Sequence, residues 1–129
     1  MEQSGPVVFV FARDGEVMAF PHLETAAGWM EAIDVLEGEY SGAFTIDGRK
    51  VTISAEPDSP VSLRVTHVGA LAELGERLGR SSALIGRRFD LSDLTAVANY
   101  LMLMEWNHRW PRRPRWLSRL IHGNGPARV

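Results

Sequence analysis

The sequence has no cysteine and only one lysine, Lys50, beside 13 arginines. Without cysteine the chain can form no disulfide bridge, no thiolate nucleophile and no cysteine-based zinc site. Such a composition fits a protein that works in a reducing compartment. It also removes several large classes of enzyme and small secreted scaffold from consideration.

Long apolar runs are missing as well. The longest candidate, 96–104, is interrupted by Asn99 and is far shorter than the roughly 20 residues that cross a bilayer. Glu2 is acidic where a signal peptide is basic, and charged residues follow the short apolar stretch 7–12 at once. We therefore expect a soluble, cytoplasmic protein without a membrane span.

What is present is an ordinary globular composition, 45% hydrophobic and 23% charged, in a chain of 129 residues. A chain of this size can bury a hydrophobic core of its own without disulfide or metal cross-links. We expect a single α+β domain over 1–108. A basic tail rich in arginine, tryptophan and proline follows over 109–129, and the sequence leaves open whether it packs on the domain.

Short apolar runs rich in β-branched and aromatic residues predict strands at 7–12 and 17–20. Alternating apolar residues predict strands at 40–46 and 61–66, and the turn at 47–48 leads into a further strand at 50–54. Asp14-Gly15 and Asp47-Gly48 each predict a hairpin, because glycine tolerates the positive φ of a type I′ turn. We therefore expect one antiparallel sheet of about five strands, made of a β-hairpin, a helix and a three-strand meander.

Three helices are expected to pack on one apolar face of this sheet, in a two-layer arrangement. The first has an apolar stripe that includes Met30 and Ile33, and Gly38 ends it in the left-handed conformation. The second covers 68–78 and is expected to break at 79–82. The third is expected to begin at an N-cap on Ser92 and to run to about Trp106.

No catalytic motif is recognisable. The sequence has no nucleophile elbow, no phosphate-binding glycine loop and no pair of histidines at metal-ligand spacing. Clustered carboxylates at 31–39 could still supply an acid–base pair, so a small enzyme assembled only in three dimensions stays an alternative. Because such carboxylates are usually solvated, we expect no enzyme, no metal and no cofactor.

Charge is distributed unevenly along the chain. Residues 1–76 hold 13 Asp/Glu and 4 Lys/Arg, whereas residues 77–129 hold 3 Asp/Glu and 10 Lys/Arg. An acidic face of this kind can attract a cationic protein partner, although the same charges also serve solubility. The candidate partner-binding residues are Glu24, Glu31, Asp34, Glu37, Glu39 and Asp47.

The basic tail gives an alternative reading. It interleaves tryptophan with arginine, and these side chains stack on bases and neutralise phosphates. Cation–π packing within the protein explains the same composition. The candidate nucleic-acid-binding residues are Arg109, Trp110, Arg112, Arg113, Arg115 and Trp116, with Arg87 and Arg88 as further candidates.

The stretches LETAA (23–27), MEAIDVLEGEY (30–40) and IDGR (46–49) form a recognisable series. Over 7–53 the chain resembles small bacterial proteins encoded beside polymorphic toxins, some of which are regarded as immunity proteins. The resemblance implies a fold and a toxin as protein partner, and it carries over no binding residue. The first hypothesis is therefore a non-enzymatic, immunity-like binding protein, and the alternative is a nucleic-acid-binding or regulatory protein.

Overall fold

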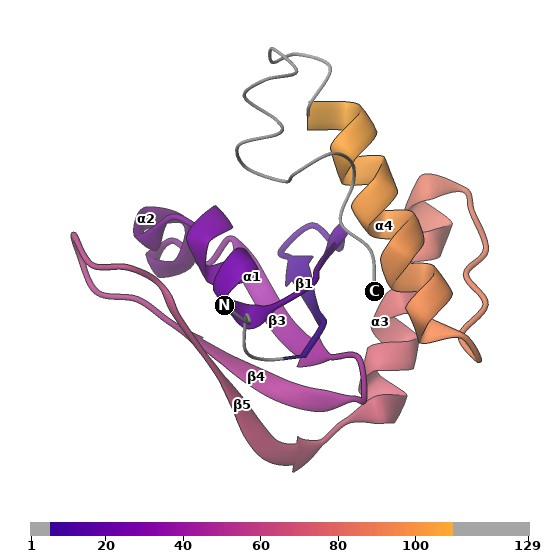
Figure 1. The fold of residues 1–129 in the computed structure, drawn as a ribbon, viewed down its shortest axis with the longest axis horizontal. Coiled ribbons are helices and arrows are strands. Elements are labelled where there is room, and N and C mark those ends of the chain that lie inside the picture. The colour runs from indigo at the N-terminus through magenta and orange to yellow at the C-terminus, as the bar shows by residue number, and fades with distance from the viewer. Residues whose placement is uncertain (1–5, 110–129) are drawn as a thin grey trace, which may run out of the picture.

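A five-stranded antiparallel sheet in the order β2-β1-β3-β4-β5 is the centre of the fold (Figure 1). The computed structural model describes residues 6–109, with side chains described to residue 105. In chain order the elements are β1 (Val8–Ala12), β2 (Val17–Phe20), α1 (Leu23–Trp29), α2 (Ala32–Leu36), β3 (Tyr40–Thr45), β4 (Arg49–Ser54), β5 (Ser62–Gly69), α3 (Leu71–Ile85) and α4 (Leu94–Arg109). The predicted α+β fold is confirmed.

Strand β1 lies inside the sheet and organises it. Phe9 is opposite Ala19 of β2 on one side and Phe44 of β3 on the other. Strands β3, β4 and β5 form the expected meander. Within residues 6–109 no helix is long and apolar enough to cross a membrane.

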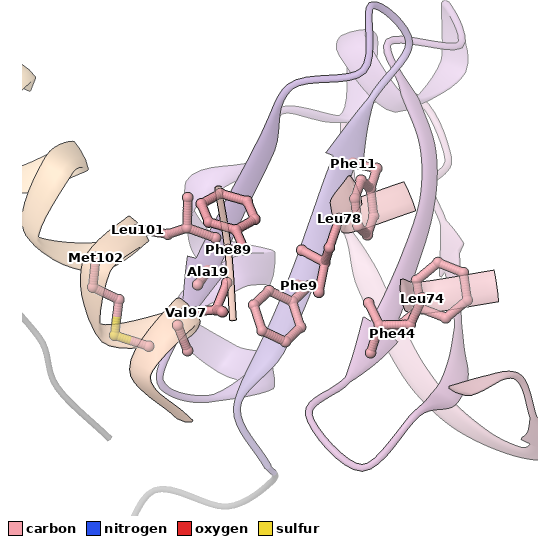
Figure 2. Close-up of a cluster of buried hydrophobic side chains, with 11 residues drawn as sticks. Phe9, Phe11, Ala19, Phe44, Leu74, Leu78, Phe89, Val97, Leu101 and Met102 are labelled. Atoms are coloured by element: carbon pink, nitrogen blue, oxygen red, sulfur yellow. The ribbon is translucent and has the colours of Figure 1, made fainter. Parts of the chain in front are cut away.

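Helices cover both faces of the sheet, so the expected two-layer arrangement is wrong. On one face Phe9, Phe11 and Phe44 pack against α3 and α4 (Figure 2). On the other face Val8 and Val10 pack with residues of α1. Successive strand side chains point to opposite faces, and the sequence of β1 is apolar at every position. Both faces of this strand must therefore be covered, which gives three layers.

The first expected helix is two helices. Met30 and Glu31 have extended backbone, so α1 ends at Trp29 and α2 starts at Ala32. Met30 is buried, with 5% of its surface exposed. The break turns α2 away from the stripe of α1, and Ile33, which the spacing placed in the core, is 59% exposed.

The other two helices also differ from the prediction. Helix α3 runs unbroken through 79–82 to Ile85, and Gly86 caps it in the left-handed conformation. Ser81, inside the expected break, is buried and donates a 2.5 Å hydrogen bond to the carbonyl of Gly15. Asp93 caps α4 in place of Ser92, since its carboxylate accepts a 3.1 Å hydrogen bond from the N–H of Ala96. Val68, expected to begin a helix, belongs to β5.

Both Asp-Gly pairs form hairpin turns, but not of the type I′ geometry. Gly15 and Gly48 have φ of +95° and +88°, whereas the aspartate before each of them does not have a positive φ, as a type I′ turn would require. The N–H of Gly15 donates a 3.0 Å hydrogen bond to the carbonyl of Ala12. The N–H of Ala12 donates a 2.8 Å hydrogen bond to the carbonyl of Glu16. This pattern is a type I turn followed by a glycine bulge.

Candidate protein-binding site

Helix α2 presents large apolar side chains to solvent among carboxylates. Ile33 and Leu36 are 59% and 53% exposed. Glu31 and Glu37, at the two ends of the helix, are exposed, and Asp34 between them is half-buried. We call these five residues the α2 surface.

The local sequence explains this orientation. Ala32 and Val35 face inward and pack against the core on the α1 side of the sheet. Ile33 and Leu36, each one position further along, therefore point outward. The N–H of Gly38 bonds the carbonyl of Val35 at 3.1 Å, and residue 39 bonds back to residue 34 at 3.0 Å. This Schellman motif, with Gly38 at φ +77° as predicted, ends α2 and directs the chain into β3.

The tip of the β1–β2 hairpin is fixed beside α2. The N–H of Arg13 bonds the carbonyl of Glu39 at 2.7 Å. The guanidinium of Arg13 also pairs with the Glu39 carboxylate at 2.8 Å, on an exposed surface where such a pair adds little stability. These contacts bring Asp14 and Glu16 next to the start of β3.

A cleft of about 560 Å³ lies between this hairpin, α1–α2 and the α3–α4 pair. Five carboxylates line it, from Asp14, Glu16, Asp34, Glu39 and Glu105. Its other walls include three aromatic rings and several aliphatic side chains, among them Trp29, Tyr40, Tyr100, Leu84 and Ile85. The lining, drawn from residues 6–109, contains no lysine, arginine or histidine. We call it the acidic cleft.

The structure separates the predicted acidic set. It brings Glu31, Asp34, Glu37 and Glu39 together at α2 and the start of β3. Asp47 lies beyond the far end of the six-residue β3, about 20 Å away, where it accepts a hydrogen bond from Thr45 and lies 3.6 Å from Arg49. Glu24 is in the first turn of α1, about 10 Å along that helix from α2.

Sequence reasoning missed part of this site. Asp14, Glu16 and Glu105 were not candidates, because their approach depends on how distant segments pack. The pairing of Ala12 with Tyr40 is what places the hairpin tip at residue 39. The Asp-Gly signal located that turn along the chain but gave no information on its neighbours in space.

The basic candidates are only partly described. Arg109 ends α4, and Trp110, Arg112, Arg113, Arg115 and Trp116 lie outside the described residues. The guanidinium of Arg87 lies 4.2 Å from the centroid of the Tyr100 ring, a cation–π contact within the protein. Arg88 is exposed. Nucleic-acid binding stays a prediction.

Among the described residues, neither the shifted pKa values nor the grouping of possible metal ligands indicates a second site. A hydrogen bond from Lys50 lowers the pKa of Glu73, and hydrogen bonds from Ser92 lower the pKa of Asp90. Neither carboxylate lines the acidic cleft. Over 6–109 no group of three or more histidine, aspartate or glutamate side chains is placed to hold a metal ion.

Comparisons with protein-family models, curated proteins and solved structures found no significant match to this chain. Two features stand out by chemistry, the α2 surface and the acidic cleft, and they share Asp34.

Proposed function

We propose that this chain is a non-enzymatic protein-binding module that neutralises a cognate bacterial toxin, in the manner of an immunity protein. The observation that carries the proposal is the α2 surface, where Ile33 and Leu36 are more than half exposed and carboxylates flank them. Exposed apolar centres with polar rims are typical of protein interfaces. The resemblance over 7–53 supports a toxin as the partner, since α2 lies inside that stretch.

The two kinds of side chain have different roles in this proposal. Complete burial of a leucine or isoleucine contributes about 1.5–3 kcal/mol, so covering the exposed half of Ile33 or Leu36 contributes about 1 kcal/mol each. The carboxylates attract a cationic toxin surface and raise the association rate at low ionic strength. In this proposal the affinity depends mainly on the apolar side chains, and the association rate depends mainly on the carboxylates that flank them.

The test begins with toxin-like domains encoded beside the gene for this chain. Each domain is expressed in a sensitive host with and without the chain, and growth is scored. A purified domain that is neutralised is then titrated against the chain by calorimetry, which gives stoichiometry and affinity. We expect growth rescue and a complex of fixed stoichiometry.

Substitutions on α2 make the test specific. The double variant Ile33→Asp with Leu36→Asp is expected to weaken binding by about tenfold or more, because both apolar contacts are lost. Val68→Asp is a matched control, since Val68 on β5 is 54% exposed, close to the 53% of Leu36, but lies outside the α2 surface. Melting curves of all variants report folding.

Charge variants test the rim separately. Glu31→Gln with Glu37→Gln is expected to slow association and to reduce its dependence on salt, with little change in dissociation. The proposal is overturned if no neighbouring domain is neutralised. It is also overturned if binding is insensitive to both pairs of α2 substitutions.

A further inference from the structure

The acidic cleft and the chain that follows α4 have opposite charge. Five carboxylates line the cleft. Two arginines beside its lining residues have contacts of their own, since Arg13 pairs with Glu39 and Arg87 lies over Tyr100. Residues 110–129 contain five arginines and no aspartate or glutamate. The chain itself therefore supplies a cationic segment that complements the cleft.

This segment also starts in the right place. Leu101, Met104 and Glu105 of α4 line the cleft, and α4 ends at Arg109. At 1.5 Å per helical residue, Glu105 is only about 6 Å along the axis from that end. An extended chain spans about 3.5 Å per residue, so position 113 can reach about 14 Å from Arg109. That distance exceeds the roughly 6 Å between Arg109 and Glu105, so the segment is long enough to turn back to the cleft lining at Glu105.

We propose that the arginine-rich segment 110–129 binds in the acidic cleft of its own chain. Its guanidinium groups supply the cations that the lining of the cleft lacks, in charge-assisted hydrogen bonds to carboxylates such as Asp34 and Glu39. Trp110 and Trp116 supply apolar area for the aromatic and aliphatic walls. Because a short tether keeps the segment at millimolar effective concentration, modest contacts suffice.

The contact has a regulatory consequence. Asp34 belongs both to the acidic cleft and to the α2 surface. A cationic partner that binds α2 must therefore compete with the segment, which acts as an internal inhibitor. This consequence rests on the proposed function, whereas the contact between segment and cleft does not and is tested without any partner.

Zero-length cross-linking tests the contact in the full chain. Arg113→Lys introduces an amine into the segment, and a carbodiimide joins an amine to a carboxylate that touches it. Lys50 is the only natural lysine, and its Nζ lies 3.2 Å from Oε1 of Glu73, so the Lys50–Glu73 product is a built-in positive control. Peptide mass spectrometry locates each product.

We expect position 113 to be joined to Asp34, Glu39 or Glu105 in monomeric protein. The matched control Arg64→Lys places an amine on β5, at the other edge of the sheet, and should give about tenfold less of these products. Molar salt should reduce the products of position 113 severalfold, because screening weakens exposed charge pairs. A mixture of ¹⁵N-labelled and unlabelled chain distinguishes products within one chain from those between chains.

Three results would overturn the proposal. One is a set of products from position 113 that favours Glu56 or Asp58 over the cleft while Lys50 still joins Glu73. Another is products that form only between labelled and unlabelled chains. The third is no product at position 113 although the Lys50–Glu73 product forms normally.

Discussion

Gly48 lies against the start of α3, and its replacement by alanine tests how the sheet and this helix fit together. Its φ is +88°, and an added Cβ would lie 2.9 Å from both Cα and Cβ of Leu71. The carbonyl of Gly48 also accepts a 2.7 Å hydrogen bond from the N–H of Ala70. The backbone on both sides is therefore held in place, so the added methyl group has nowhere to move.

Two effects set the size of the loss for Gly48→Ala. The left-handed conformation costs an L-residue about 1–2 kcal/mol. Forcing extra volume into a close contact costs about 1–3 kcal/mol more. The expected total is about 2–5 kcal/mol, which for a chain of this length lowers the melting temperature by about 8–20 °C.

Two other turn glycines provide the comparison. Gly38 has φ +77° but nothing within 4 Å of an added Cβ, so Gly38→Ala should lose only the backbone contribution, about 1–2 kcal/mol. At Gly15, with φ +95°, the added Cβ would meet the flexible end of the Leu84 side chain at 3.0 Å, so Gly15→Ala should be intermediate. Urea unfolding of the three variants gives the order. If Gly48→Ala lost no more unfolding free energy than Gly38→Ala, the close contact between this turn and α3 would be refuted.

Three further predictions concern α3. Gly79→Ala should stabilise the chain by about 0.5–1 kcal/mol in urea unfolding, since Gly79 is inside a continuous helix with open space at its Cβ; destabilisation would indicate a break there. Arg77→Met should cost about 1–2 kcal/mol in the same assay, because its guanidinium lies 5.4 and 5.3 Å from two core phenylalanine centroids; an unchanged midpoint would contradict this. Lys50 lowers the pKa of Glu73, so the carboxylate stabilises the fold above its ordinary pKa of 4.5 and loses this effect as pH falls through the lowered value. The melting difference between Glu73→Gln and the natural chain should therefore shrink in acid, and a difference that grew would refute the assignment.

The strands were predictable from the sequence because their signal is local. Apolar residues alternate or run together over short stretches, and Asp-Gly pairs lie between β1 and β2 and between β3 and β4. The predicted strand positions agree closely with the structure except that β5 continues to Gly69. The same local signals do not count layers, and the unbroken apolar sequence of β1 was the clue that both faces are covered.

The helices were harder because tertiary contacts override local rules. Helical spacing carried the first helix past Met30, but burial of Met30 breaks it and turns Ile33 outward. Glycine is a poor helix former, yet the packing of Leu74 and Leu78 and the bond from Ser81 to the β1–β2 turn keep α3 intact through Gly79. In both cases the deciding contact comes from a segment distant in the sequence.

The candidate site also combines features that local sequence predicts with features that depend on contacts between distant segments. The four acidic residues at 31–39 could be seen in the sequence, because α2 and its Schellman motif are local. The acidic cleft could not be seen, because its carboxylates come from the β1–β2 turn, α2, the start of β3 and α4. Only the antiparallel pairing of β1 with β3 and the packing of α4 against the sheet bring them together.

The concentration of charge in the acidic cleft is itself an argument for binding. Like charges gathered at one place repel one another and oppose folding. The core of this fold needs none of the five, because the buried clusters on both faces of the sheet consist of apolar residues. Arg13 offsets part of the repulsion at Glu39, and Asp14, Glu16 and Asp34 add to it without contributing to the core. A cluster of charges that opposes folding and adds nothing to the buried core supports the proposed binding of the arginine-rich segment of the same chain and of a cationic partner that displaces it.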